Sequence, residues 1–446
     1  MLVAVLAAVL LPGCGARVDD EQARICREVV PAVNPDGTEI SDLRISAAAL
    51  GQQGVRIDYV AHPPGEASAA RFVACGFGGG TFSPERLNLV AVETESGRQG
   101  EAWLFYFKRY WLGSADAANV RIGEPAVPRL PAAVAYAVQQ LINAIALSSV
   151  YALLAIAYSL IYGITGRINL AFGEIAMLGA YGAISAIAVL IALGRDDPFA
   201  AIALALAIAA GVAGLWSALI GRHVIAPLHA RHRLGQPILV ATAGLAIALQ
   251  ELMHIVQGVR ERWIPPLFNE PIALARASTF VVTVTPIEIA VALVTFATAA
   301  AMLWLFTRTK FGLSWRAFAD DPHAAVLLGV DGGRLLGATF VLAGLCAGLA
   351  GAVVGVHYGI VDASMGTMLG LKALIAALIG GIGSVPGAFL GGLVVGLIET
   401  SWSAYFDMTL RDMVVYTFLI VLFLMRPGGL FGLANPDPPP AGRAGV

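Results

Sequence analysis

Polar side chains stand within the apolar stretches of this chain, where an ionisable group is costly and is by default a candidate for function. One acid and one base in such surroundings could together hold a zwitterionic solute, and Glu174 and Lys372 are such a pair of types. The sequence does not show that these two residues meet. The alternatives are structural ion pairs, side chains that reach the membrane surface, and exposure at the end of a span. The polar residues concerned are Asn169, Glu174, Gln250, Glu251, His254, Lys372 and Glu399.

Glycines and a proline interrupt the apolar stretch Lys372–Glu399. Helix breakers at membrane depth are tolerated only where neighbouring protein or a water-filled cavity satisfies the freed backbone groups. We therefore expect two shorter segments here, packed into a helical bundle and separated by the breakers Gly380-Gly381, Gly383 and Pro386-Gly387. The residues predicted to line a path through the membrane are Asn169, Glu174, Lys372, Gly380, Gly381 and Gly383.

A polar island, Arg308–Arg334, separates two other apolar stretches. Asp320-Asp321-Pro322 predicts a helix start, because carboxylates stabilise the positive end of the helix dipole and proline is favoured in the first turn. We expect a short helix over His323–Val330, closed by Gly329 and by Gly332-Gly333. A rigid helix between two spans is typical of a docking site for a soluble partner, and the alternative is an ordinary solvated connector.

Enzymatic and metal-binding patterns are missing from the sequence. The phosphate-binding pattern G-x-x-x-x-G-K-[ST] does not occur, and none of the lysines, Lys108, Lys310 and Lys372, follows a glycine. Neither a nucleophile–base pair nor a metal-ligand spacing is visible. A formal net charge of -2 excludes a strongly basic nucleic-acid binder. We expect no catalytic residue, no metal and no resident cofactor.

Membrane helices must position these residues, because 58% of the 446 residues are hydrophobic and only 13% are charged. The expected fold is an all-α polytopic membrane protein of about eight segments, one broken by Gly and Pro, with a β-rich extracytoplasmic N-terminal extension. A helix needs roughly 20 apolar residues to cross a bilayer. Beside the broken stretch, the expected spans are 137–162, 170–193, 200–221, 237–257, 285–306, 335–360 and 411–425.

Basic loops indicate the orientation, because loops rich in Lys and Arg tend to stay cytoplasmic. The loop Arg222–Gln236 carries three arginines and no acid, and the island carries four basic residues. Placing both in the cytoplasm also puts Arg167 and Arg426 there, and puts residues 15–130 outside. Every dense basic loop then lies on one side.

The N-terminal third is more polar than the rest, since half of the 30 acidic residues precede residue 131. Residues 1–14 have the length of a signal-peptide apolar region, and Cys14 is a predicted lipidation site. The alternatives are an uncleaved anchor or a misassigned start. Residues 15–130 form the predicted extension, in which Cys26 and Cys75 either form a disulfide or remain free thiols. The strands expected there are 54–61, 71–77, 86–95 and 101–110.

Four stretches, in the same order, resemble the membrane permeases of branched-chain amino acid ABC transporters, of the LivH type. The resemblance covers about Gln139–Gly432, which predicts a permease domain over 131–433 and a cytoplasmic tail over 434–446. The stretches are Gln139–Gly182, the island pattern R-A-x-A-x-D-x-x-x-A-x-L-x-G, LIGGIGSVPGAFLGG and RPGGLFG.

The resemblance implies that the island contacts an ATPase. The residues to which it assigns this coupling are Arg316, Ala317, Ala319, Asp320, Asp321, Ala325, Leu327 and Gly329. One position departs from the family, because Phe172 stands where the family has a histidine, and a polar role there is in doubt.

The resemblance also implies partners and a location. These are two cytoplasmic ATPase subunits that bind the ATP, a second LivM-type permease subunit and a periplasmic substrate-binding protein, assembled in the bacterial inner membrane. The cargo would be branched-chain or other aliphatic amino acids, or, in related permeases, urea or short amides. The alternative class is a stand-alone secondary transporter that uses the broken stretch as a discontinuous binding helix. An ABC permease requires ATPase partners, whereas a secondary transporter does not.

Overall fold

The computed structural model describes residues 18–35, 37–50, 53–65, 67–79, 83, 85–112, 128–193, 198–231, 236–258, 260–264, 271–277 and 280–431. The predicted signal-like segment with Cys14, and the predicted tail 434–446, lie outside the described residues. The chain divides into two compact units. They are Met1–Pro128 with Leu193–Phe199, and Arg129–Ala192 with Ala200–Val446.

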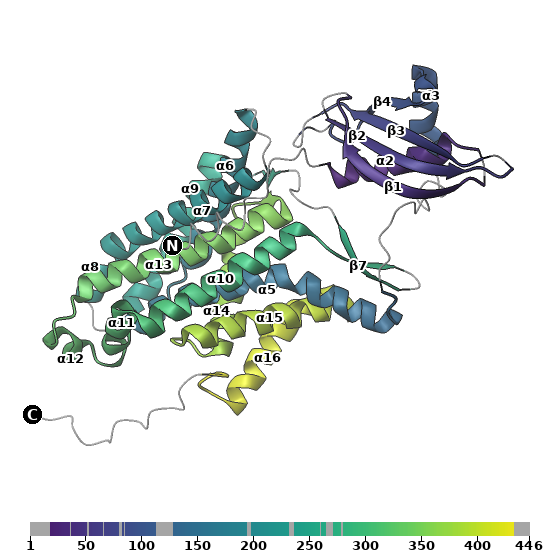
Figure 1. Ribbon diagram of the computed structural model, residues 1–446. Coiled ribbons are helices and arrows are strands. Elements are labelled where there is room, and N and C mark those ends of the chain that lie inside the picture. Colours follow the sequence, from purple (N-terminus) through teal and green to yellow (C-terminus); the bar gives the residue numbers. More distant parts are fainter. Residues whose placement is uncertain are drawn as a thin grey trace, which may run out of the picture. The chain divides into compact units, whose positions relative to one another are not determined.

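The first unit contains a five-stranded antiparallel sheet with helices packed against it (Figure 1). The strands follow one another in space as they do in sequence. They are β1 (Glu39–Ala47), β2 (Gln53–His62), β3 (Ala69–Phe77), β4 (Leu89–Thr94) and β5 (Gly97–Arg98). The helical elements are α2 (Asp20–Ala32), α3 (Glu101–Tyr106) and a π-helical turn, η1 (Phe107–Trp111), that continues α3.

Helix α2 was not anticipated, although its start carries a recognisable signal. The Asp19 carboxylate accepts the N–H groups of Glu21 and Gln22 and so caps the helix. Its buried side chains fall at helical spacing and meet the inward-facing residues of the sheet. The members of this core from α2 are Ala23, Ile25, Cys26, Val29 and Val30.

The prediction of a strand over 101–110 was wrong, because these residues form α3 and η1. Their aromatic content favours a strand, but Trp103 and Phe107 stack with ring centroids 5.0 Å apart, which is the i, i+4 contact of a helix. The Trp111 indole N–H also donates to the Glu28 carbonyl, at 2.9 Å. Packing on the core therefore overrides the strand propensity.

The second unit is a bundle of helices, and eight helices of the described chain are long and apolar enough to cross a membrane. This confirms the expected fold class. The helices are α5 (Ala132–Thr165), α6 (Phe172–Ala192), α7 (Pro198–Ile220) continued by η2 (Gly221–Ile225) and α8 (Ala226–Arg231), α9 (Gln236–Gln257), α10 (Pro286–Arg308), α11 (Lys310–Asp320), α12 (Pro322–Leu327), α13 (Gly332–Val353) continued by η3 (Val354–Tyr358), α14 (Met365–Gly380), α15 (Val385–Tyr405) and, after η4 (Met408–Leu410), α16 (Arg411–Met425).

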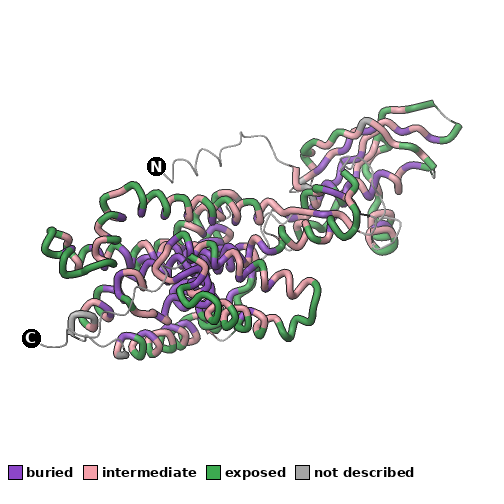
Figure 2. Tube along the Cα trace, turned by 90° about the horizontal axis from the view of Figure 1, so that it is seen from below, coloured by how far each residue is buried: buried purple, intermediate pink, exposed green. Residues whose placement is uncertain are grey.

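Helix α5 is the centre of this unit, with 89% of its most apolar window buried, against 6% for α16. Figure 2 shows the buried residues gathered in the middle of the bundle with exposed residues around them. The packing uses small side chains: a Cβ added to Gly392 of α15 would collide with the backbone of Ala152 in α5. Close approach of this kind is how membrane helices gain contact without a hydrophobic driving force.

Two helices, α14 and α15, correspond to the two segments expected from the broken stretch. Pro386-Gly387 does not break a helix, however, because both residues lie in the first turn of α15. Proline is tolerated there, and the Ser384 hydroxyl caps the turn by accepting the Gly387 N–H. Helix α15 is consequently a full 21 residues rather than a short segment.

Short strands join the helices at the end of the bundle away from the island. They are β6 (Arg262–Trp263), which pairs with β9 (Ile360–Val361), and β7 (Ile272–Arg276), which pairs with β8 (Val281–Val284). The Tyr136 hydroxyl, in the first turns of α5, donates to the Ala404 carbonyl at the end of α15, at 2.8 Å. Helices α5 and α15 therefore run antiparallel.

A disulfide joins Cys26 of α2 to Cys75 of β3, with the Cα atoms 5.8 Å apart. Replacing both residues by alanine should lower the free energy of unfolding of the first unit by about 4 kcal/mol, because the bond closes a long loop in the unfolded chain. Pulse proteolysis of the full chain in urea measures this. The change Cys346→Ala, at a buried thiol of the second unit, is the control. An unchanged midpoint in the double variant would contradict the prediction.

Candidate coupling surface and membrane charge network

The polar island folds into two helices, α11 and α12, which meet at Asp321. The Asp321 carboxylate accepts the N–H groups of His323 and Ala324, at 2.9 and 3.1 Å, and Pro322 occupies the first turn. Asp321 is thus the N-cap that its sequence position indicated. Asp320 instead ends α11.

Helix α12 ends in a glycine turn. Gly329 has a φ of +89°, which favours glycine, and its N–H donates to the Val326 carbonyl at 3.0 Å. The next N–H, of Val330, donates to the Ala325 carbonyl at 3.0 Å, which completes a Schellman-type cap. The expectation that Gly332-Gly333 also closes this helix was wrong, because both begin α13 behind Asp331, which caps that helix.

A buried indole fixes the island to the bundle. Trp315 of α11 is 5% exposed and meets the Phe306 ring of α10 edge-on, with centroids 5.0 Å apart. Its six-membered ring also fills the space where Gly163 of α5 lacks a side chain, so that any Cβ there would collide with it. The sequence analysis did not predict this contact. Its one indication in the sequence is a single tryptophan within a polar segment.

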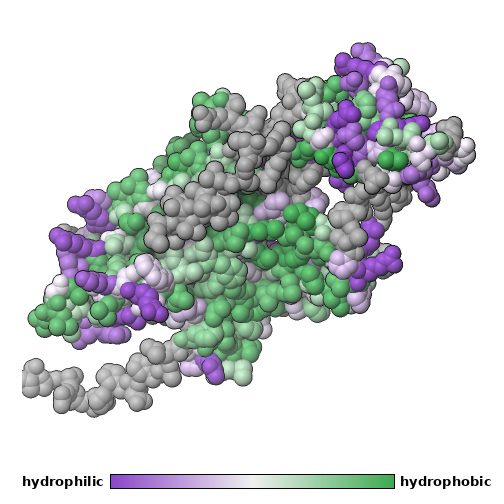
Figure 3. Space-filling model, viewed as in Figure 1, coloured by the Kyte–Doolittle hydropathy of each residue, from purple (hydrophilic) through white to green (hydrophobic). Residues whose placement is uncertain are grey.

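The tip of α12 is apolar and exposed. Val326, Leu327 and Leu328 are 55%, 88% and 83% exposed. In Figure 3 hydrophilic residues gather at the end of the bundle that carries α11 and α12, and hydrophobic residues cover much of its flank. Two leucines this exposed, at the end of a short helix that is capped at both ends, have the form of a docking site for another protein.

Most of the residues that the resemblance assigns to ATPase coupling are exposed on α11 and α12. Arg316, Ala319, Asp320, Asp321, Leu327 and Gly329 are exposed, and Ala317 is half-buried. Ala325 is 1% exposed, so it supports the turn of α12 rather than offering a contact. The neighbours Val326 and Leu328 share the exposure of Leu327 but were absent from the assigned set.

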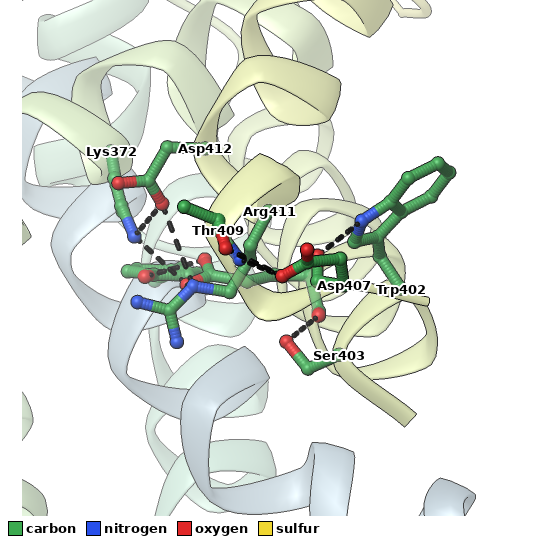
Figure 4. Close-up of polar contacts among 9 residues, drawn as sticks. Lys372, Trp402, Ser403, Asp407, Thr409, Arg411 and Asp412 are labelled. Carbon is green, nitrogen blue, oxygen red and sulfur yellow. Dashed lines mark hydrogen bonds and ion pairs between the residues drawn. The ribbon is translucent and has the colours of Figure 1, made fainter. Parts of the chain in front are cut away.

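A network of four charged side chains lies between α14, α15 and α16. Lys372 Nζ is 2.8 Å from Glu399 Oε1 and 2.7 Å from Asp412 Oδ1. Arg411 Nε is 3.1 Å from the same Glu399 oxygen, and the Tyr151 hydroxyl of α5 donates to Glu399 Oε2 at 2.8 Å. Figure 4 shows Lys372, Asp412 and Arg411 pointing toward one another.

The network is electrically balanced, with two cations and two anions. The Glu399 side chain is 2% exposed and the Lys372 side chain 10%, while Arg411 and Asp412 are about one-third to one-half exposed. Both oxygens of the buried carboxylate have partners, which is the condition for keeping an ion pair away from water. Sequence reasoning flagged Lys372 and Glu399 but missed Tyr151, Arg411 and Asp412.

The turn before α16 helps to set the position of Arg411 and Asp412. The Asp407 carboxylate accepts the N–H and the hydroxyl of Thr409, at 2.9 and 2.5 Å, and these bonds hold the pKa of Asp407 below its ordinary value. The Trp402 indole N–H donates to the Asp407 carbonyl at 3.1 Å (Figure 4).

Glu174 is not the ion-pair partner of Lys372. Its Oε1 accepts the Thr367 hydroxyl at 2.8 Å, and Thr367 lies five residues before Lys372, on a different side of α14. Its Oε2 is buried without a hydrogen bond from any described residue, as is the side-chain amide nitrogen of Asn169. The Asn169 carbonyl oxygen caps the backbone by accepting the Ala171 N–H.

The glycines expected to line a path form the α14–α15 turn. Gly381 and Gly383 have φ values of 101° and 94°, and the Gly383 N–H donates to Ser159 Oγ of α5 at 3.0 Å. The C-terminal stretch closes the turn, because the N–H groups of Leu430 and Phe431 donate to the Ile379 and Gly380 carbonyls, at 2.8 and 3.1 Å. These bonds satisfy carbonyls that the end of α14 would leave open.

The remaining candidates lie on α9. His254 is 3.6 Å from Glu251, whose side chain is 64% exposed. Surface exposure therefore accounts for Glu251. Among the described residues, no group of three or more His, Cys, Asp or Glu could hold a metal ion.

Residues 140–424 match the family model described as "Branched-chain amino acid transport system / permease component". The chain belongs to this permease family. Among its relatives, the high-affinity branched-chain amino acid transport system permease protein LivH of Escherichia coli is 35% identical over 297 residues, which are 67% of this chain and 96% of that protein. BraD of Pseudomonas aeruginosa, with the corresponding description, is 34% identical over 294 residues, 66% and 95% of the two chains.

Family membership confirms the resemblance seen in the sequence and identifies a multi-pass inner-membrane transport subunit, not an enzyme. One local departure is explained by packing. Phe172, where the sequence resemblance leads us to expect a histidine, is fully buried between Tyr158 and Phe340, with ring centroids 5.8 and 6.3 Å away. This permease has an apolar contact at that site.

The charge network predicts a specific pattern of stability. Glu399→Leu leaves Lys372 and Arg411 sharing one partial partner, Asp412, and should lower the stability of the permease by about 3 kcal/mol, because an uncompensated charge stays buried. Adding Lys372→Met restores neutrality and should recover most of that loss. Thermal unfolding in detergent of the single and double variants measures the difference.

The control for this cycle is Glu251→Leu on the exposed side of α9, which should change stability by less than about 0.5 kcal/mol. Additive losses in the Lys372→Met, Glu399→Leu double variant would show that the two residues do not interact as described.

Proposed function

We propose that this chain is the permease subunit of an ABC importer that forms the translocation path for branched-chain or other aliphatic amino acids. The relatives named above are described as branched-chain amino acid permeases, and the family model covers residues 140–424 of the helical unit. The observation that carries the proposal is the exposed apolar tip of α12, which follows directly on α11, the helix that Trp315 packs against α5. A transporter without an ATPase partner has no evident use for such a docking site.

The tip of α12 fits a groove on a cytoplasmic ATPase subunit. ATP would bind to two such subunits and not to this chain, and movement of the ATPases would tilt α11 and, through Trp315, α5. Contact with a cytoplasmic ATPase requires the island to face the cytoplasm. The same orientation puts Arg167 and Arg426 in the cytoplasm and residues 15–130 outside, as the basic loops indicate.

A second, LivM-type permease subunit would complete the path. The support is the exposure of α16 and α9, whose most apolar windows are only 6% and 22% buried, so that both helices offer faces to lipid or to another subunit. A periplasmic substrate-binding protein would deliver the amino acid. It would also set most of the specificity, which is why the permease sequence reports the cargo poorly.

Within the membrane, the charge network is the candidate contact for a zwitterion. Lys372 and Arg411 could exchange their carboxylate partners for that of a substrate, and Glu399 could take its ammonium group. The uncovered oxygen of Glu174 and amide nitrogen of Asn169 are further polar groups in the same bundle.

The coupling proposal is tested by co-purification in detergent. The change Leu327→Asp with Leu328→Asp should abolish retention of the ATPase subunits, because it puts charge on the docking surface without touching the buried Ala325 or Trp315. Met408→Asp, at an exposed apolar residue before α16, is the matched control and should retain them. If the wild-type chain purifies without ATPase and still moves leucine into liposomes, the proposal fails and a secondary transporter takes its place.

A further inference from the structure

The helix formed by α3 and η1 in the first unit has two apolar faces. One face packs into the core of the unit through Trp103, Phe107 and Trp111. This face is fixed by the Trp103–Phe107 stack and by the indole hydrogen bond of Trp111. The helix therefore cannot turn to bury its other side.

The opposite face carries an aromatic–basic ridge, defined here as Phe105, Tyr106, Arg109 and Tyr110. Their spacing puts them on one side of the helix. Phe105, Tyr106 and Tyr110 are 68%, 66% and 60% exposed, and Arg109 is exposed beside them. The Tyr106 and Tyr110 rings contact each other, with centroids 4.6 Å apart.

Large apolar side chains on a helix normally lie on the face that packs against the core. Nothing in the described part of the first unit covers the ridge, although that unit buries the other aromatic residues of the same helix. Three large rings on one exposed patch mark a surface that meets another phase or molecule.

The composition of the ridge fits the interface of a lipid bilayer. Tyrosine rings place an apolar body in the acyl region and a hydroxyl in the headgroups, and such residues are enriched at membrane interfaces. Arginine reaches anionic headgroups while its stem stays in apolar surroundings. Lys108, whose Nζ is 2.7 Å from Asn88 Oδ1, adds a second cation next to the ridge.

The chain itself holds the ridge close to a membrane. Only residues 111–131 separate it from Ala132, where α5 begins, and α5 is one of the helices long and apolar enough to cross a membrane. Twenty-one residues reach at most roughly 70 Å when fully extended. Because the ridge is tethered, it meets the bilayer at a high effective concentration. Three rings are therefore enough to bind the membrane surface even if their intrinsic affinity for lipid is weak.

We propose that the aromatic–basic ridge inserts into the headgroup region of the bilayer surface from which α5 enters, and so lays the first unit on the membrane. This does not depend on the substrate of the permease or on its ATPase partners. The occupant is the lipid surface itself, with anionic headgroups matching Arg109 and Lys108.

The test uses the full chain in lipid nanodiscs with an environment-sensitive fluorophore at Tyr106→Cys. Cys14→Ser and Cys346→Ala remove other thiols and leave the Cys26–Cys75 bond intact. The matched control is the probe at Glu39→Cys, an exposed position on β1, at the other edge of the sheet from β4. Lipids with a shallow spin label should quench the probe at position 106 severalfold more than the control.

Two further variants sharpen the result. Phe105→Ser with Tyr110→Ser should reduce the quenching at position 106 to the control level. Arg109→Glu should reduce it more in phosphatidylglycerol than in phosphatidylcholine, because the charge contact requires anionic lipid. Mass spectrometry verifies that each variant keeps the Cys26–Cys75 disulfide, and resistance of the first unit to protease verifies that it still folds.

Several outcomes would overturn the proposal. One is equal quenching at positions 39 and 106 in nanodiscs. A second is a probe at position 106 that stays in water and becomes shielded only when a substrate-binding protein is added, which would make the ridge a protein-docking surface. A third is shielding that appears only with two copies per nanodisc, which would make the ridge a contact between copies of this chain.

Discussion

The arrangement of the second unit depends on the contact between the Trp315 indole and the bare backbone of Gly163. The indole is the largest group that connects the polar island to the apolar bundle, and glycine is the only residue that leaves room for it. Helix α5, which receives this contact, also packs closely against α15 through Gly392 and contributes Tyr151 to the charge network. In the proposed importer, a displacement of α11 would therefore reach α5, the helix that most of the bundle surrounds.

The charge network is a second contact on which the bundle depends, and it joins α5, α14, α15 and α16. Helix α16 has little buried surface, with Val415 its one buried residue. It is held instead by Arg411 and Asp412 at its start and by the backbone bonds of Leu430 and Phe431 after its end. Ion pairs and backbone hydrogen bonds, rather than packed side chains, therefore hold α16 to the bundle.

The sequence allowed the bundle to be predicted because its signals are long and local. Apolar runs locate the spans, and Asp321-Pro322 and Gly329 locate α12, because capping acts on the residue's own turn. The sequence did not reveal which polar residues meet. It offered Glu174 and Lys372 as an acid and a base, but Lys372 contacts Glu399 and Glu174 contacts Thr367. Aromatic residues over 101–110 misled for a related reason, since their conformation depends on the core they pack against. Long-range packing, which brings Gly163 to Trp315 and Leu430 to Ile379, has no local signature.

The most direct test of this account is the amount of leucine taken up per ATP hydrolysed in proteoliposomes with the ATPase and permease partners, comparing Trp315→Ala with the wild type. The exposed Trp304 of α10 supplies the matched control, Trp304→Ala. We predict that Trp315→Ala still binds and hydrolyses ATP but loses about tenfold in uptake per ATP, within the usual range of coupling free energies, while the control does not. Unchanged uptake per ATP in Trp315→Ala would show that the island does not act on α5 through this contact.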